Sequence, residues 1–339
     1  MCLKILAVAT NWVGDAVLSL AALRALRARY PEAHITLLAR PWVADVYRRE
    51  SFPNRILPAP AKWRERIAQA RSLRAERFDT ALLLPNSFAS ALVARLAGIL
   101  KRIGYDRDGR GFLLTQAIPV PKPGEIPVHE SFYYLELLRR AGMIAELPPA
   151  APIVLEGADE ARRSGLDLFA RMGFDGPVVG IAPGAQNSRA KQWFPERFAE
   201  TAVQLAGTLG AQVAIFGSSG ERALGQSIAE AVRRAGYPVL NLAGETTLAE
   251  FIEMAAACRL FVSNDSGAMH VAAALAVPTV AVFGPTRWLE TAPAGPRCLI
   301  VREPVECSPC MLRDCPIDHR CMAAISAGRV ADAAIELMK

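Results

Sequence analysis

The chain is 339 residues long, which favours two domains, and hydrophobic residues make up 52% of it against 21% charged residues. This balance excludes a disordered chain, and 24 Gly and 24 Pro exclude a collagen-like or low-complexity protein. The longest apolar run, Val271 to Phe283, contains Pro278 and is too short to span a bilayer.

The first strand is expected to follow Lys4 directly. Its apolar stretch, Ile5 to Ala9, gives way at once to polar Thr10 and Asn11, which does not fit a secretory leader. We therefore expect a buried strand here and a cytoplasmic protein that is not transmembrane. Disulfides are rare in that compartment.

Short β-branched runs alternate with helical patterns along the whole chain. The pattern predicts an α/β fold in which parallel sheets are covered by helices on both faces, as in doubly wound, Rossmann-like domains. Strands are predicted at 3–9, 34–38, 80–84, 178–182, 212–216, 259–263 and 279–283, and helices at 16–30, 64–77, 87–98, 129–141, 158–172, 195–209, 221–235, 248–257 and 267–275.

A Pro-rich break at 148–152 divides this series. It predicts one domain over residues 1–155 and a second over 175–339, with the ligand site in the cleft between them at the carboxyl ends of the strands.

The positive charge is confined to the first half. Residues 1–150 hold 22 Lys and Arg against 13 Asp and Glu, the remainder holds 17 against 20, and the net charge is +6. Basic residues are densest over 55–77, which fits either a solvated helix face or a surface that attracts phosphates. Because no nucleic-acid motif accompanies them, we expect no nucleic-acid partner and favour a lipid surface or a polyanionic substrate.

The turn after the first strand, residues 10–15, contains one glycine, Gly14. It lacks the G-x-G-x-x-G fingerprint, which argues against an NAD-type oxidoreductase. Asp15 follows at the start of a predicted helix, where the helix dipole favours its ionised form; it is either a general base or a helix cap. The Asp106-Arg107-Asp108 pattern imitates a metal-binding motif but fits an exposed turn better.

Four predicted strands of the second half end in small or polar turns, at 183–185, 217–220, 264–267 and 284–286. Such turns let a ligand approach the backbone, and the helix starts that follow favour an anion, so they predict a phosphate or nucleotide site. Lys191 is either a solvated loop lysine or the cation that neutralises a diphosphate. His270 either packs near its helix end or hydrogen-bonds a phosphate or sugar.

Four cysteines lie close together near the end of the chain. Cys307, Cys310, Cys315 and Cys321 form a C-x2-C-x4-C-x5-C pattern, with His319 nearby. In a reducing compartment the pattern predicts a structural metal, zinc first and an iron–sulfur centre second. Disulfides and a redox-sensitive surface loop are the alternatives.

Several of these motifs, taken in order, resemble glycosyltransferase family 9, the lipopolysaccharide heptosyltransferases, and in particular the type that adds the second inner-core heptose. The similar segments are 11–15 (NWVGD), 84–88 (LPNSF), 183–185 (PGA) with Ala190-Lys191, 216–218 (FGS), 242–246 (LAGET), 264–270 (NDSGAMH) and 283–286 (FGPT).

The resemblance implies a GT-B fold and inverting transfer of heptose from ADP-L-glycero-D-manno-heptose to the first heptose of a lipid A–Kdo–heptose acceptor. It implies no cofactor required for catalysis and a peripheral location at the cytoplasmic face of the inner membrane. The first domain would bind acceptor and the second ADP-heptose. Asp15 would be the base and Lys191 would stabilise the departing diphosphate. Gln186, Asn187, Gly217, Ser218, Glu221, Asp265, Ser266, Gly267 and His270 would contact the donor, and Trp12, Asn86 and Ser87 would lie on the acceptor side.

Other functions stay open at this point. A heptosyltransferase that recognises a different acceptor, of type I or III, and a GT-B nucleotide-sugar epimerase are the enzymatic alternatives. A nucleotide-sugar-binding sensor is the non-enzymatic one; it would tolerate loss of Asp15, whereas the transferase would not.

Overall fold

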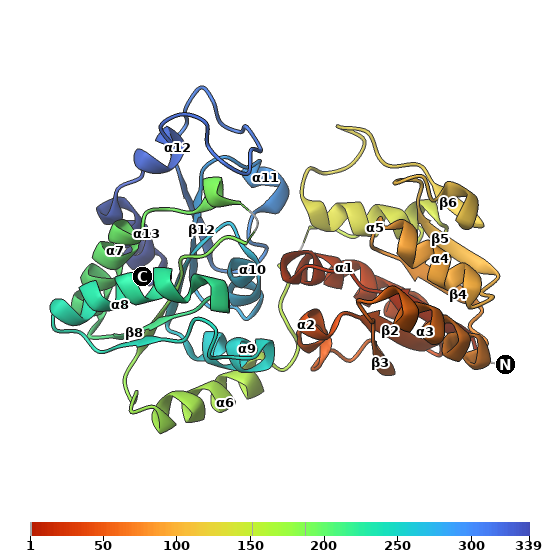
Figure 1. The fold of residues 1–339 in the computed structure, drawn as a ribbon, viewed down its shortest axis with the longest axis horizontal. Helices are drawn as coiled ribbons and strands as arrows, with labels where there is room; N and C mark the ends of the chain where they lie inside the picture. The colour runs from red at the N-terminus through yellow and green to blue at the C-terminus, as the bar shows by residue number, and fades with distance from the viewer. Residues whose placement is uncertain (1, 151, 187) are drawn as a thin grey trace. The chain divides into compact units, whose positions relative to one another are not determined.

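The computed structural model describes residues 2–150, 152–186 and 188–339. These residues form two compact units, Met1–Ala151 and Pro152–Lys339, each built on one six-stranded parallel sheet (Figure 1).

In the first unit the strand order is β3-β2-β1-β4-β5-β6. The elements are β1 (Lys4–Val8), α1 (Val13–Arg29), β2 (His34–Ala39), α2 (Pro41–Ala44), η1 (Asp45–Tyr47), β3 (Arg55–Pro58), α3 (Trp63–Glu76), β4 (Thr80–Leu83), α4 (Phe88–Leu96), β5 (Lys101–Tyr105), η2 (Gly111–Leu113), β6 (Gln116–Ile118) and α5 (Glu130–Arg140).

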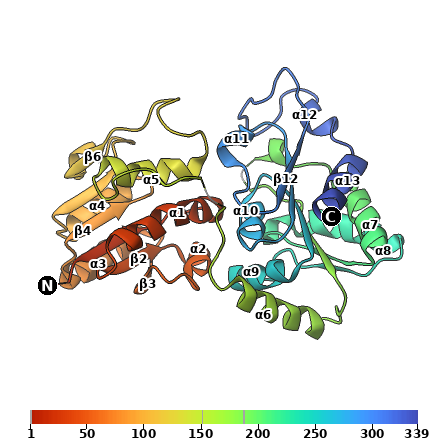
Figure 2. The same cartoon turned by 180° about the vertical axis from the view of Figure 1, so that it is seen from behind.

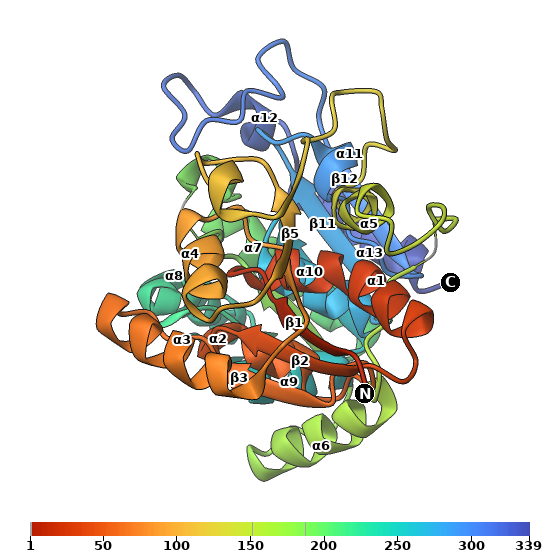
Figure 3. The same cartoon turned by 90° about the vertical axis from the view of Figure 1, so that its right-hand side faces the viewer.

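Helices cover both faces of this sheet. Alternate side chains of the central strands, Leu6 and Val8 of β1 and Leu83 of β4, pack with Leu73 of α3 and Ala94 of α4. Each leucine side chain fully removed from water contributes roughly 1.5–3 kcal/mol. Helices α1 and α5 contact one another, and Figure 3 shows them on the other side of β1 from α3 and α4. A continuous apolar run such as that of β1 is what a strand buried on both faces requires.

In the second unit the strand order is β12-β11-β10-β7-β8-β9. The elements are α6 (Ala158–Arg171), β7 (Val178–Ala182), η3 (Arg189–Lys191), α7 (Pro195–Leu209), β8 (Gln212–Ile215), η4 (Ser219–Glu221), α8 (Arg222–Arg234), β9 (Val239–Asn241), α9 (Leu248–Ala257), β10 (Leu260–Asn264), α10 (Gly267–Ala274), β11 (Thr279–Phe283), α11 (Trp288–Thr291), β12 (Cys298–Arg302), α12 (Arg320–Ala323) and α13 (Ala327–Leu337).

The second sheet is also sandwiched between helices. Helices α7, α8 and α13 pack together over one core, and α6, α9 and α10 form the other set (Figure 2). The sequence placed the start of the second domain near residue 175, after the predicted helix at 158–172. The structure instead includes that helix, α6, in the second unit, because it packs along α9.

Candidate functional site

The four small, polar turns of the second unit lie at one edge of its sheet. They follow β7, β8, β10 and β11, which are parallel and occupy consecutive positions in the order β11-β10-β7-β8. Because the carboxyl ends of parallel strands meet at the same edge, the convergence predicted from the sequence is confirmed for the strands that carry these turns.

Lys191 and Asp265 form an ion pair at this edge. Lys191 Nζ lies 2.8 Å from Asp265 Oδ2, and the aspartate side chain is only 5% exposed while that of the lysine is 28% exposed. The hydroxyl of Thr286, in the turn after β11, donates to the same oxygen at 2.8 Å. The buried carboxylate therefore holds a partly exposed ammonium at the point where a helix begins.

A buried amide fixes both ends of the loop that carries Lys191. Asn264, the last residue of β10, donates from Nδ2 to the carbonyl of Pro183 at 2.6 Å. Its Oδ1 accepts from the backbone N–H of Trp193 at 3.1 Å. One side chain thus ties the residue that follows β7 to Trp193, two residues before α7, so the loop is closed at its base.

A second acidic group, Glu221, lies over the start of the same loop. A Cβ atom at Gly184 would clash with the Glu221 carboxylate, so a side chain here would have to displace that carboxylate. Glu221 Oε2 accepts from the backbone N–H of Ser218 at 2.7 Å and from its hydroxyl at 2.9 Å. Ser218 is exposed, and Gly217 and Glu221 are half-buried.

The remaining predicted donor residues are placed as follows. Gln186 is exposed in a turn, whereas the predicted Asn187 lies outside the described residues. Ser266 is the residue before α10; its hydroxyl lies 3.1 Å from that of Ser263, and Gly267 begins the helix. His270 is buried in the first turns of α10, at 5% exposure.

In the first unit, Asp15 lies half-buried in the first turn of α1. Burial, followed by the charge of Asp15, raises the pKa of Tyr134 well above its usual range. The same carboxylate contributes to the raised pKa of Tyr47, although burial again is the main cause. Asp15 therefore stands close to two neutral, buried phenols. Trp12, just before the helix, is 54% exposed.

A buried arginine that the sequence analysis missed organises the turn after β4. Arg110 is 0% exposed and donates to the carbonyls of Pro85 and Ser87 and to the side chains of Asn86 and Ser90. Burial lowers its pKa. Asn86 also donates to the Tyr133 hydroxyl at 2.8 Å, so the predicted acceptor-side amide is held by internal partners. Ser87 accepts from the backbone N–H of Ser90 and caps α4.

Replacement of Arg110 by alanine is expected to destabilise the protein strongly. Arg110 also donates to the carbonyl of Tyr105, and its loss would leave buried acceptors such as the carbonyls of Tyr105 and Pro85 without this donor, which costs on the order of 3 kcal/mol of unfolding free energy. Chemical denaturation, followed by circular dichroism, measures the change. Arg95→Ala, at an exposed arginine of α4, is the matched control and should change stability by less than about 0.5 kcal/mol. If the Arg110→Ala and Arg95→Ala variants unfolded at the same denaturant concentration, the role given to Arg110 would be refuted.

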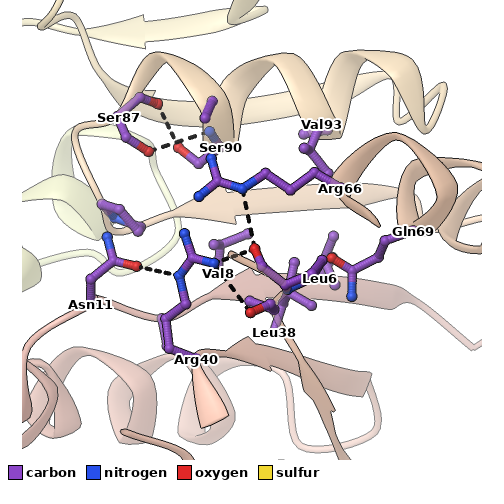
Figure 4. A pocket seen from close by; sticks show the side chains of 16 residues that line it. Leu6, Val8, Asn11, Leu38, Arg40, Arg66, Gln69, Ser87, Ser90 and Val93 are labelled. Carbon is purple, nitrogen blue, oxygen red and sulfur yellow. Dashed lines mark hydrogen bonds between the residues drawn. The ribbon is translucent and has the colours of Figure 1, made fainter. Parts of the chain in front are cut away.

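A small pocket lies beside this turn, between α3 and α4 (Figure 4). Its cavity volume is about 50 Å³, more than the roughly 10–15 Å³ that a single water needs. Arg40 and Arg66 line it together with Asn11 and the predicted Ser87. Arg40 donates to Asn11 Oδ1 at 3.1 Å, and both arginines donate to the carbonyl of Pro60. The pocket is positively charged because arginines stay protonated in proteins, although burial and the charge of Arg66 lower the pKa of Arg40.

The four clustered cysteines are free thiols in a loop near the end of the chain. Among the described residues, no three His, Cys, Asp or Glu side chains are arranged to hold a metal ion. Cys307 and Cys310 are exposed, whereas Cys321 is buried. Burial, followed by the charges of Cys307, Cys310 and Cys315, raises the pKa of the Cys321 thiol to about 11. The metal prediction for Cys307, Cys310, Cys315 and Cys321 stays a prediction; residues 305–322, the cysteine-rich segment, form a loop and the start of α12.

Comparison with known proteins decides the family. The profile of glycosyltransferase family 9 (heptosyltransferase) matches residues 66–320. The chain belongs to glycosyltransferase family 9. It is 35% identical to lipopolysaccharide heptosyltransferase 2 of Salmonella typhimurium over 88% of each chain, and 35% identical to the Escherichia coli K12 protein of the same name, again over 88% of each. The solved structure of E. coli ADP-heptose LPS heptosyltransferase II is similar with a TM-score of 0.85, at 32% identity, over 99% of this chain and 98% of that one.

Membership confirms that this glycosyltransferase is an enzyme with a GT-B type fold, in which each unit is a Rossmann-like α/β domain. It removes the oxidoreductase alternative. In the part of the chain that the structure describes, no helix is both long and apolar enough to cross a membrane.

Proposed function

We propose that the enzyme transfers heptose from ADP-L-glycero-D-manno-heptose to the first heptose of the lipopolysaccharide inner core, with inversion at the anomeric carbon. The observation that carries the proposal is the Lys191 ammonium held by buried Asp265 at the carboxyl edge of the second sheet. It provides a fixed positive charge for a diphosphate, in a chain whose relatives are named heptosyltransferase 2.

The reaction needs one base and one site for the leaving group. The acceptor hydroxyl oxygen attacks the anomeric carbon as the carbon–oxygen bond to ADP breaks, and that electron pair leaves with ADP. Asp15 takes the hydroxyl proton, a role that suits a carboxylate kept ionised in the first turn of α1. Lys191 and the N–H groups at the start of α10 stabilise the charge that develops on the diphosphate.

The other residues of the second unit supply donor contacts. The Glu221 carboxylate lies against Gly184 and accepts from the Ser218 hydroxyl, which places both polar groups at this edge of the sheet. Hydroxyls of a ribose suit the carboxylate of Glu221. Gln186, Asn187, Gly217, Ser266, Gly267 and His270 complete the set that we assign to the donor.

The acceptor belongs to the first unit. Lipid A, Kdo and inner-core heptose carry phosphates and carboxylates, and the two guanidinium groups of Arg40 and Arg66 give their pocket the charge to attract one such group. Exposed Trp12 fits an acceptor contact, whereas Asn86 and Ser87 shape the turn that forms one wall.

An assay of ADP release tests the proposal and its closest alternatives. Purified enzyme is given ADP-heptose with acceptors that end either in Kdo or in one heptose. We expect ADP release, with product formation, only from the heptose-terminated acceptor. Release only with the Kdo-terminated acceptor would identify a type I enzyme. Binding of ADP-heptose without turnover on either acceptor would favour the nucleotide-sugar sensor.

We infer further that the enzyme works peripherally at an anionic membrane surface on the cytoplasmic side. Helix α3 supports this, because Arg64, Arg71 and Arg74 are exposed along it and Trp63 at its start is 47% exposed. The same assay, with the acceptor embedded in vesicles, provides the test: adding anionic lipid should raise the rate. A rate independent of lipid charge would remove the membrane role of α3.

A further inference from the structure

The two side chains that contact Asp265 come from loops that are both tied to the cysteine-rich segment. Lys191 belongs to the loop after β7 and Thr286 to the turn after β11. Residues 305–322 leave β12 and lead into α12, as the blue loop of Figure 1 shows.

The loop of Lys191 is held at the residue before the lysine. Ala190 is 2% exposed. Its N–H donates to the carbonyl of Arg313 at 2.9 Å, and its carbonyl lies 2.6 Å from His319 Nε2. Since a carbonyl only accepts, Nε2 carries the hydrogen in this contact. Both polar backbone groups of Ala190 are thus bonded to the cysteine-rich segment.

The turn that carries Thr286 is held by the same segment. The Ser308 hydroxyl donates to the carbonyl of Gly284 at 2.6 Å, and the N–H of Met311 donates to the carbonyl of Pro285 at 2.9 Å. A Cβ atom at Gly284 would lie 3.0 Å from Cys321 Sγ, so the turn packs directly on the buried thiol.

We propose that His319 is a positioning residue for Lys191, and that the cysteine-rich segment is the brace that fixes Lys191 and Thr286 on Asp265. The proposal rests on the diphosphate role given to Lys191 above. His319 is half-buried, and its ring packs at 5.7 Å from that of Phe194, which follows the loop. Its ring is therefore held on one side while its N–H fixes the Ala190 carbonyl, one residue from the catalytic cation.

A second contact between the loop and the segment contributes little to this brace. Arg189 and Asp314 form an ion pair of 2.7 Å, but their side chains are 83% and 62% exposed. Solvent and salt screen such a pair, so it does not fix the loop.

Three substitutions at His319 separate the hydrogen bond from the backbone conformation. His319 has a φ of +54°, which asparagine tolerates well. Gln places its amide N–H where Nε2 of histidine lies, whereas Asn is too short to reach. We expect His319→Ala and His319→Asn to weaken ADP binding about tenfold, measured by titration calorimetry, and His319→Gln to restore most of the affinity. Ile317→Ala, at a 58% exposed side chain of the same segment, is the matched control and should bind as the wild type does.

A double variant tests whether His319 acts through Lys191. If it does, His319→Ala adds little to the loss already caused by Lys191→Ala, whereas independent effects multiply. Wild-type ADP affinity in His319→Ala, rescue by Asn as complete as by Gln, or multiplicative losses would each overturn the proposal. Because ADP affinity is measured without acceptor, a failure of the heptosyltransferase assay with the wild type would refute the proposed function separately.

Discussion

Replacement of Asp15 by asparagine is expected to lower turnover by a factor on the order of 10²–10⁴ while leaving the affinity for ADP-heptose nearly unchanged. The amide has the same shape as the carboxylate but cannot take the proton of the acceptor hydroxyl. The loss should therefore appear in kcat, measured by ADP release at saturating acceptor, and not in the dissociation constant of the donor, measured by calorimetry.

The control for this variant is Asp79→Asn, the same change at an exposed aspartate just before β4, at the opposite end of the first sheet. Its carboxylate accepts from the backbone N–H of Lys4 at 2.8 Å, which an amide oxygen can also do. Asp79→Asn should turn over at the wild-type rate. If Asp15→Asn did so as well, Asp15 would be removed from the mechanism and another base would be needed.

Replacement of Lys191 by alanine is expected to lower kcat/KM by about 10²–10³-fold, because the charge on the departing ADP would lose its nearest fixed cation. Unlike the Asp15 variant, this one should also bind ADP more weakly. The change leaves the Asp265 carboxylate, 5% exposed, without its ammonium, so a lower melting temperature is expected as well. Steady-state kinetics, calorimetry with ADP and thermal melting measure the three effects.

Two further variants show whether the effect of Lys191→Ala is specific to this side chain or reflects the charge of the loop in general. Lys191→Arg keeps the charge but changes its geometry, and should recover part of the ADP affinity. Arg189→Ala removes the other cation of η3, whose side chain is 83% exposed, and should leave kcat/KM near the wild-type value. Equal losses from Lys191→Ala and Arg189→Ala would show a general effect of loop charge and would refute the specific role.

The strands that the sequence predicted correctly are those buried on both faces. Four of them are nearly continuous apolar segments: β1, β7, β10 and β11. Such a segment, when it is short and lies between turns, is typical of a strand buried on both faces. β5 was missed because it begins with Lys101 and Arg102, which suggest an exposed segment. Arg102 is only 9% exposed, and carbonyls such as that of Leu113 accept its hydrogen bonds. These hydrogen bonds, which compensate for the burial of the Arg102 charge, depend on tertiary contacts and leave no local pattern in the sequence.

Other missed elements have different causes. β6 and β9 contain three residues each, too few for an alternation to be recognised. β3 lies at an edge of its sheet, begins with an arginine and ends with a proline, which is tolerated in an edge strand.

Part of the candidate site could be predicted from the sequence because its residues lie in recognisable turns at strand ends. Turn residues at strand ends mark the edge where a ligand binds, so Lys191 and Asp265 could be named, but their pairing could not. Arg40 and Arg110 were missed because their partners are carbonyls and amides of distant segments, which no spacing rule connects. The spacing of the cysteines does not by itself give the geometry of their side chains: among the described residues, no three possible ligands are arranged to hold a metal ion.

The Asn264-Asp265 pair cannot be interchanged, although the two side chains have nearly the same size. Asn264 must donate to one backbone group and accept from another, which an ionised carboxylate cannot do because it has no hydrogen to give. Asp265 must offer one oxygen to two donors and neutralise an ammonium, which an amide cannot do. Deamidation of Asn264 to aspartate would therefore remove the hydrogen bond that closes the base of the loop. It would leave the groups of the Lys191–Asp265 ion pair chemically unchanged.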